Sequence, residues 1–165
     1  MDVTLRIAAE DDLFFLTEAV HKTFAYLTQC GDDPYNRGFS DITIEEMEAY
    51  ALEYLDPRKS RTFILQHAQQ EIGCIMGQIA PSHLSAAGIG LVGWIGLCYV
   101  DEAYRQQSHC TRMFEALQAW FASKAVSIIE LSYMAANETA RTTWKHLGFE
   151  PFREIAYKKI GSETF

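Results

Sequence analysis

The sequence predicts a mixed α/β domain, and three observations lead to that fold class. The spacing of apolar residues changes repeatedly along the chain between the alternation of strands and the period of amphipathic helices. Hydrophobic residues make up 48% and aromatic residues 13% of the chain, which is typical of a compact globular fold. The length of 165 residues suits one domain, which we expect to span residues 1–165.

The first third of the chain predicts one strand and two helices. Residues 3–8 alternate as a strand does, and an acidic pair then precedes apolar residues at helical spacing over residues 13–24. Residues 28–41 contain Gly, Pro and Asn, which predict a loop. Thr43 and Glu46 have the spacing of a capping box, so a second helix is expected to begin there.

The middle of the chain predicts three consecutive strands. Residues 61–67 and 72–80 flank a short polar turn and predict a β-hairpin. Residues 92–100, VGWIGLCYV, predict a buried strand, in which the glycines indicate a bulge or a close backbone approach.

The last third predicts two helices separated by a strand. Residues 104–113, YRQQSHCTRM, lead into a helix expected to begin at residue 110 or 111. Residues 126–134 predict a strand, and Asn137 then begins a short helix that ends near residue 147. Residues 148–160 are expected to close the chain as a last pair of strands.

Charge and composition restrict the partners. The formal net charge of −8 argues against nucleic acid or an anionic membrane as a partner and favours cationic small molecules. The chain shows no apolar run of the roughly 20 residues of a membrane helix. Its N-terminus lacks the features of a signal peptide, and its four cysteines are dispersed, so we expect a cytoplasmic protein with reduced thiols. Neither cysteine nor histidine shows the spacing of metal ligands, so no metal is expected.

The loop over residues 104–113 carries the main chemical signal. A tight loop that feeds a helix N-terminus directs backbone N–H groups and the positive end of the helix dipole at one place, which suits a pyrophosphate. Arg105 would add a positive charge there.

The chain resembles the GNAT acyltransferase superfamily in two motifs. Val100, Tyr104 and Arg105 match the strand end V-x-P-x-Y-R, after which the family has its acyl-CoA loop, Q/R-x-x-G-x-G/A. Residues 137–149, NETARTTWKHLGF, match N-x-x-A-x-x-x-Y-x-x-x-G-F, with the family tyrosine replaced by Trp144. The motifs cover about a third of the chain, and the order of elements agrees over the rest.

The resemblance implies a GNAT-like domain with a central mixed, mostly antiparallel twisted sheet flanked by about four helices. It implies an acyl-CoA-dependent N-acyltransferase that moves an acetyl or other short acyl group from CoA to a primary amine by direct transfer. Acetyl-CoA or another acyl-CoA would be the co-substrate. The acceptor would be a small-molecule amine or a protein amine. Many relatives of this fold form homodimers, although the sequence itself does not indicate the oligomeric state.

The resemblance also implies which residues hold the cofactor. The backbone near Cys98 and Val100 would pair with pantetheine between two strands, and an N–H near Tyr99 or Val100 would stabilise the oxyanion. Asn137 and Trp144 would lie near the cofactor arm. The pyrophosphate would be held by Arg105 and by the amides of Gln106, Gln107, Ser108, His109, Cys110 and Thr111.

The loop departs from the family because Ser108 and Cys110 occupy its two glycine positions. Glycine permits a positive φ or the close approach of a ligand. Serine and cysteine keep every backbone N–H, so a phosphate contact remains feasible provided that the conformation is αR-like.

Neither the acid nor the base of the family is present. Trp144 stands where the family has a tyrosine that protonates the CoA thiolate, and an indole N–H is no acid. A core tryptophan is an equally good interpretation of Trp144. The strand around Trp94 offers no glutamate as a base. Tyr99 and Tyr133 are the first catalytic candidates elsewhere in the chain, followed by Tyr157, Cys98 and His83, although each is more often structural. Positioning alone gives much of the acceleration of a direct transfer.

Acidic residues early in the chain offer a second ambiguity. Asp32, Asp33, Glu45 and Glu46 would suit a cationic amine if they line the acceptor pocket, whereas a solvated helix face is the simpler interpretation.

The loss of glycines and tyrosine motivates an alternative function, a degenerate GNAT domain that binds acyl-CoA or a protein partner without turnover. A purely structural module that binds no CoA is the third hypothesis.

Overall fold

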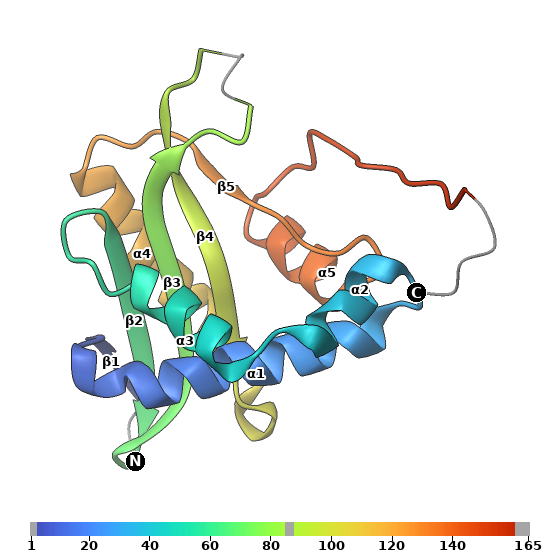
Figure 1. Cartoon of the computed structure of the whole chain (residues 1–165). Coiled ribbons are helices and arrows are strands. Elements are labelled where there is room, and N and C mark those ends of the chain that lie inside the picture. Colours follow the sequence, from blue (N-terminus) through green and yellow to red (C-terminus); the bar gives the residue numbers. More distant parts are fainter. Residues whose placement is uncertain (1–2, 85–87, 161–165) are drawn as a thin grey trace.

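The fold is built on one five-stranded sheet with the strand order β1-β2-β3-β4-β5 (Figure 1). The computed structural model describes residues 3–84 and 88–160. Three of the four strand pairings, β1-β2, β2-β3 and β3-β4, are antiparallel, and the pairing of β4 with β5 is parallel, which confirms the mostly antiparallel sheet. The strands are β1 (Val3–Ile7), β2 (Ser60–His67), β3 (Gln70–Pro81), β4 (Leu91–Val100) and β5 (Ile129–Leu131).

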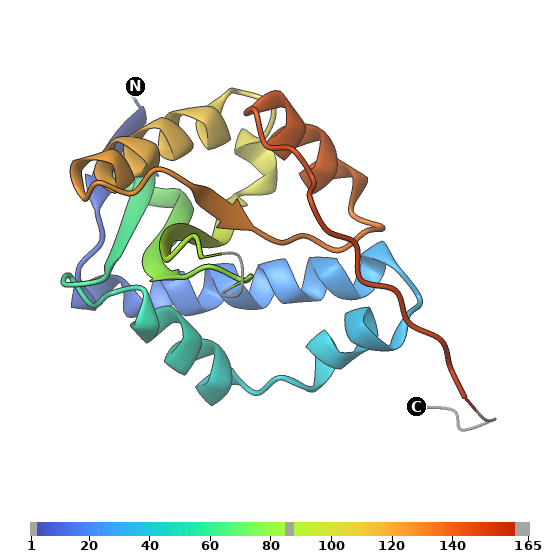
Figure 2. The ribbon, with the colours of Figure 1, turned by 90° about the horizontal axis from the view of Figure 1, so that it is seen from above.

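Helices cover both faces of this sheet (Figure 2). One face carries α1 and α3, and the other carries α4 and α5, as the two hydrophobic clusters show. In the described part of the chain no helix has the length and apolar character needed to cross a membrane. The α-helices are α1 (Leu13–Cys30), α2 (Pro34–Gly38), α3 (Ile44–Glu53), α4 (His109–Ser123) and α5 (Glu138–His146).

Each face has its own core. On the α1 and α3 side, Leu16 and Tyr54 pack against the sheet and are almost completely buried. On the α4 side, the apolar stripe of α4 buries Met113, Leu117 and Phe121. Burying an aliphatic or aromatic side chain of this size is worth about 1.5–3 kcal/mol, so these two layers fix the sheet between the helices.

The hairpin and the bulge are confirmed. Ala68 and Gln69 form the two-residue turn between β2 and β3, and both have a positive φ, 51° and 69°, as a type I′ turn requires. The register between β3 and β4 shifts where Met76 faces Leu97 and Gly77 faces Ile95, which leaves Gly96 as the extra residue.

Two boundaries of the predicted elements change. The segment 28–41, predicted as a loop, contains the end of α1 and the short helix α2. Asp33 explains α2, because its carboxylate accepts hydrogen bonds from the N–H groups of Tyr35 and Asn36. The strand predicted over residues 126–134 is paired only at Ile129–Leu131.

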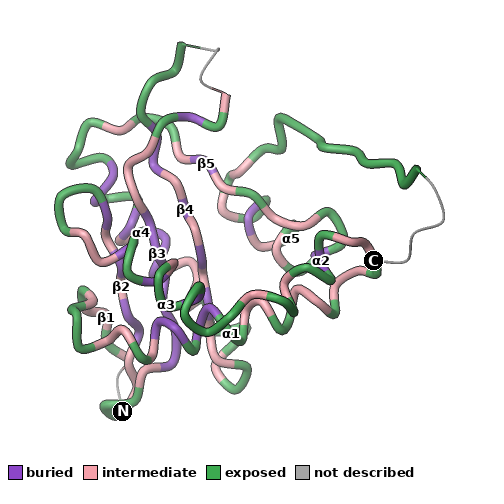
Figure 3. Tube along the Cα trace, viewed as in Figure 1, coloured by how far each residue is buried: buried purple, intermediate pink, exposed green. Residues whose placement is uncertain are grey.

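The predicted last pair of strands is wrong. Residues 149–160 form no strand, and residues 150–160 are all exposed (Figure 3). Within the described residues, the segment makes one backbone hydrogen bond, from Phe149 N–H to Trp144 O. Pro151 cannot donate to a strand ladder, and the three-residue β5 offers a short edge for pairing.

Candidate functional site

The site begins where β4 and β5 separate. The two strands pair only between Gly93–Ile95 and Ile129–Leu131, and they then diverge (Figure 1). Asp101 N–H, just past the strand, donates to Ile72 O on β3 at 2.7 Å. Because backbone groups alternate along a strand, the N–H groups of Cys98 and Val100 face away from β3 and toward the opening.

The loop after β4 presents free amides at the start of α4. The first backbone hydrogen bond of this helix runs from Arg112 N–H to Ser108 O, at 3.1 Å. Among the described residues, the preceding N–H groups of His109, Cys110 and Thr111 have no acceptor. Three amides and the positive end of a fifteen-residue helix thus converge beside the end of β4.

Ser108 adopts the conformation that glycine usually supplies. Its φ and ψ are 60° and 17°, in the left-handed region, and Gln106 also has a positive φ of 61°. The αR-like conformation on which the phosphate contact was made conditional is therefore not adopted by Ser108, whereas Cys110 lies within α4 and is helical. The loop therefore keeps a backbone path that usually requires glycine, although it contains none. Successive backbone N–H groups in such turns form a concave anion site.

The side chains around the loop are only partly engaged. Arg105 is exposed, and its Nε donates to Val100 O at 3.0 Å, which joins the loop to the strand end. Gln106 and Gln107 are exposed, and Thr111 is half-buried. His109 has a buried Nε2 without a partner among the described atoms, and burial, with a smaller contribution from Arg112, lowers its pKa.

Two tyrosines of the α3 region meet the bulge of β4. Tyr50 Oη donates to Gly96 O at 2.9 Å, and Gln78 Nε2 donates to Tyr54 Oη at 3.4 Å. A Cβ at Gly96 would lie 2.0 Å from Tyr54 Oη, so only glycine fits beneath this hydroxyl. Burial raises the pKa of Tyr54, which therefore keeps its proton. We did not predict this pair, although its i, i+4 spacing at the end of an apolar helix face was visible in the sequence.

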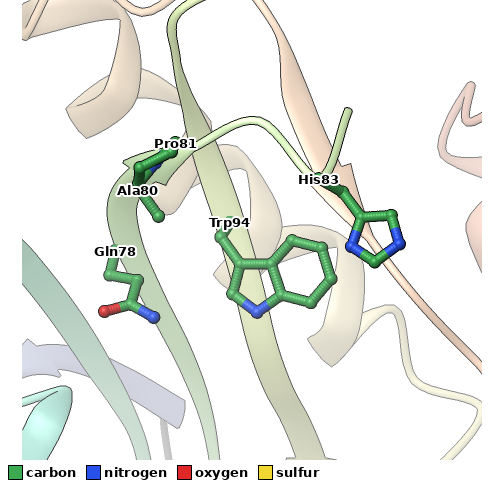
Figure 4. Close-up of a pocket in the computed structure, with 5 residues that line it drawn as sticks. All are labelled: Gln78, Ala80, Pro81, His83 and Trp94. Carbon is green, nitrogen blue, oxygen red and sulfur yellow. The ribbon is translucent and has the colours of Figure 1, made fainter. Parts of the chain in front are cut away.

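A shallow cavity of about 220 Å³ lies beside the bulge (Figure 4). It is lined by Gln78, Ala80, Pro81, His83 and Trp94. The rings of His83 and Trp94 are nearly parallel, with centroids 6.4 Å apart and planes at 19°. Gln78 belongs both to this cavity and to the hydrogen bond with Tyr54, so the cavity adjoins the bulge.

Glu130 holds the rim of this cavity and was missed by the sequence analysis. The residue is 6% exposed, and its carboxylate accepts hydrogen bonds from Ser82 Oγ at 2.6 Å and from His83 N–H at 2.9 Å. A single acid in an apolar strand is the signal that would have identified it, because buried carboxylates are rare unless they are paired. The two bonds fix the backbone that carries His83.

The candidate catalytic residues lie in the two cores or beside them. Tyr99 is buried on the α1 side with the ammonium of Lys22 5.9 Å from its ring centre, and burial raises its pKa. Tyr133 follows β5 and is half-buried against the other core. Trp144 is buried there, in edge contact with Phe149 at 5.4 Å.

Most of the candidate substrate carboxylates already have structural partners. Asp33 caps α2, and Glu46 completes the capping box of α3 with Thr43. Asp32 forms an ion pair with Arg37, and Glu45 is exposed in the first turn of α3. Asn137 likewise caps α5, its Oδ1 accepting from Ala140 N–H at 3.0 Å. In the described ranges no group of three potential ligands is placed to hold a metal ion.

The site thus belongs to an α/β protein in which two diverging strands lead to a loop of free amides at a helix start. The chain belongs to the acetyltransferase (GNAT) family, whose family model matches residues 22–149. This result confirms the resemblance seen in the two motifs. No curated protein matches the chain at a significant level.

Solved structures share the fold at low sequence identity. The chain is similar to a GCN5-related N-acetyltransferase from Ralstonia eutropha JMP134, with 17% identity, 97% of this chain and 100% of that chain covered, and a TM-score of 0.76. It is also similar to AAC(6')-Iy in complex with the bisubstrate analogue CoA-S-monomethyl-acetylneamine, with 17% identity, coverage of 98% and 100%, and a TM-score of 0.74. A predicted acetyltransferase from Clostridium acetobutylicum, solved with acetyl-CoA, has 19% identity, coverage of 96% for both chains and a TM-score of 0.71.

Proposed function

We propose that the protein is an acyl-CoA-dependent N-acyltransferase that moves an acetyl or other short acyl group to a primary amine. The observation that carries this proposal is the set of unbonded amides at His109, Cys110 and Thr111, beside the opening between β4 and β5. CoA would supply the activated thioester, and its pyrophosphate needs the kind of donors that a helix start offers. The direct transfer then requires both substrates in one site.

The cofactor contacts would follow the backbone. The N–H groups of Cys98 and Val100 face the opening and would pair with the pantetheine amides, and the Val100 N–H is the better placed oxyanion donor. Arg105 would contribute charge, since only its Nε is engaged by Val100 O. Asn137 and Trp144 would border the arm from α5.

The acceptor amine would enter at the cavity of Gln78, His83 and Trp94. An indole face attracts a cation, and an overall charge of −8 favours cationic ligands. Asp32, Asp33, Glu45 and Glu46 remain candidates for the outer part of this site, although three of them have partners. The acceptor would be a small-molecule amine or a protein amine.

Proton transfer would use different groups from those of the family motif. Trp144 has no acidic proton, so we propose Tyr133, which is half-buried just after β5, as the donor to the leaving thiolate. Tyr99 stays as the alternative candidate. The change Tyr133→Phe would lower kcat about 100-fold with little change in the affinity for acetyl-CoA, whereas an unchanged kcat would remove Tyr133 from this role.

A second candidate function is binding of acyl-CoA or of a protein partner without turnover. The observation that favours it is Trp144, which is buried in the core in place of the family tyrosine. Both candidates predict a bound acyl-CoA or partner, but only the enzyme releases free CoA thiol when an amine is present.

Thermal unfolding with acetyl-CoA, free CoA and ATP tests the proposal. A ligand at 100 times its Kd stabilises the native state by about 2.7 kcal/mol. We expect stabilisation by acetyl-CoA and not by ATP, followed by thiol release in a screen of amines. Arg105→Ala should weaken the effect, and Arg58→Ala is the matched control because Arg58 is exposed and pairs with Asp56. If acetyl-CoA does not stabilise the protein, the proposed function is wrong.

We also propose that the protein acts in the cytoplasm as a homodimer. The four cysteines are free thiols, which suits a reducing compartment. The exposed segment 150–160 carries Phe152, Ile155, Tyr157 and Ile160 and offers apolar surface for a second copy.

A further inference from the structure

Two thiols meet beside the proposed pyrophosphate loop. Cys98 lies near the end of β4 and Cys110 in the first turn of α4, and their Sγ atoms are 3.3 Å apart. Both residues are half-buried, and both are free cysteines. Cys110 stands at the last position of the family loop motif, where glycine or alanine is usual, so the contact depends on this departure from the motif.

The contact is close to the geometry of a disulfide. A disulfide bond is about 2.0 Å long, so the two sulfurs need to approach each other by only about 1 Å. The cysteines are twelve positions apart, and a bond between them would enclose the whole loop from the end of β4 to the start of α4. Closing such a loop restricts the unfolded chain and therefore stabilises the folded one.

The pair also contains a preferred nucleophile. The hydrogen bond from Cys98 lowers the pKa of Cys110, against the opposing effect of burial. The same contact, together with burial, raises the pKa of Cys98. The thiolate is the reactive form in disulfide exchange, so Cys110 would attack first and Cys98 would resolve the intermediate.

We propose that Cys98 and Cys110 form a dithiol modification site that a small disulfide oxidant converts into an intramolecular disulfide. With oxidised glutathione, the Cys110 thiolate attacks one sulfur, releases one glutathione thiol and forms a mixed disulfide. Cys98 then loses its proton, attacks the Cys110 sulfur and releases the second glutathione. Two cysteine thiols are oxidised, and one glutathione disulfide is reduced to two thiols.

The modification would oppose acyl-CoA binding, and this part rests on the proposed function. The backbone N–H of Cys110 is one of the three amides proposed to hold the pyrophosphate. Drawing the sulfurs together requires a shift of β4 or of the first turn of α4, and amide hydrogen bonds weaken steeply with distance and angle. Because linkage is reciprocal, a bound acyl-CoA would equally hinder disulfide formation.

The site is tested by treating the reduced protein with oxidised glutathione and mapping the products by mass spectrometry. We expect Cys98 and Cys110 to disappear together, with a peptide pair that has lost two hydrogen atoms. Cys30 is the internal control, since it lies on α1 and can form only a glutathione adduct. Cys74 is completely buried and should remain a thiol.

Two conservative variants keep the test decisive. In the variant Cys98→Ser, the glutathione adduct on Cys110 should accumulate. In the variant Cys110→Ser, the thiol of Cys98 should stay unmodified. The proposal is overturned if wild-type protein keeps both thiols while Cys30 reacts, or if stable glutathione adducts form on the pair without an internal disulfide.

Acetyl-CoA provides the second arm. In a glutathione redox buffer at equilibrium, a saturating concentration should lower the ratio of disulfide to dithiol protein by roughly fivefold or more. An unchanged ratio in a protein that acetyl-CoA stabilises thermally would disprove the coupling. An absence of thermal stabilisation would instead disprove the proposed function, and the disulfide result would stand by itself.

Discussion

At the scale of single residues, Ser108 shows how a loop keeps its path after losing its glycines. A left-handed conformation costs a non-glycine residue about 1–2 kcal/mol, because Cβ approaches the next carbonyl oxygen. Ser108 has φ 60° and makes no side-chain capping bond, so nothing in its own side chain offsets this cost.

The change Ser108→Gly should therefore stabilise the protein. We expect the free energy of unfolding to rise by about 0.5–1 kcal/mol, since the relief of strain exceeds the entropy that glycine adds to the unfolded chain. Urea unfolding measures this change. Ser123→Gly, at the other end of α4 in right-handed backbone, is the matched control and should lose up to about 1 kcal/mol. A loss of stability in both variants would show that Ser108 is not strained.

Gly96 is the second residue whose identity the structure explains. A methyl group there would lie 2.0 Å from Tyr54 Oη and 2.7 Å from Tyr50 Oη, and Tyr54 is only 2% exposed. We expect Gly96→Ala to destabilise the fold by about 1–3 kcal/mol, because the buried ring has no free space to move into. Thermal unfolding checks this value. Gly38→Ala is the control, with nothing within 4 Å and helical backbone, and should be neutral or slightly stabilising.

The sequence could predict residue positions better than residue roles. The match at Val100, Arg105 and Asn137 located the loop and the two helices that follow it. The left-handed path of Ser108 and the partners of Glu130 depend on contacts between segments far apart in the chain. Such contacts leave no local pattern, which is why Tyr54 and the Cys98–Cys110 pair appeared only in the structure.

At the scale of elements, Arg6 and Asp12 join β1 to the start of α1. The guanidinium donates two hydrogen bonds to the carboxylate, at 2.7 and 2.6 Å, and Asp12 also accepts from Ala9 N–H at 2.7 Å. The hydrogen bond from Arg6 is the main reason that the pKa of Asp12 is lowered, and burial acts in the opposite direction.

Asp12→Asn should remove a pH-dependent part of the stability. A lowered folded-state pKa contributes stability above the unfolded value of about 4, and this contribution is lost as pH falls through the folded-state pKa. We expect a loss of about 1 kcal/mol at neutral pH, a modest value because Arg6 is one-third exposed. The gap between wild type and variant should close as pH falls through the lowered folded-state pKa of Asp12. Urea unfolding across pH 2–8 measures it, and a gap that stays constant with pH would contradict this role.

Element prediction succeeded where the signal is local. The capping box of Thr43 and Glu46 and the turn at Ala68 and Gln69 are formed as expected, because side chains within a few residues decide them. The strand predicted over 126–134 shrank to Ile129–Leu131, since strand length depends on how much of β4 is available for pairing. Apolar composition alone does not contain that information.

At the scale of the whole molecule, the sheet separates two chemical environments. The α4 side carries the free amides and the thiol pair, and the α1 and α3 side carries the tyrosines and the aromatic cavity. Gly96 lies between them, because its strand borders the opening and its backbone meets Tyr54. Because direct transfer requires both substrates in one site, the proposed function has cofactor and acceptor meet at the opening between β4 and β5.

The exposed segment 150–160 predicts how the molecules associate. Phe152, Ile155 and Tyr157 are 62%, 75% and 49% exposed, and Tyr157 contacts the ring of Tyr35, with the ring centroids 5.5 Å apart. Apolar side chains exposed in a row favour association, and a second copy also offers the open edge of β5 for pairing. We expect a homodimer by light scattering, and the double variant Phe152→Ser with Ile155→Ser should be monomeric at the same concentration. Phe14→Ser is the control, since Phe14 is 77% exposed on α1 and should not affect the dimer. A wild-type monomer, or a double variant that remains dimeric, would show that this segment does not form the interface.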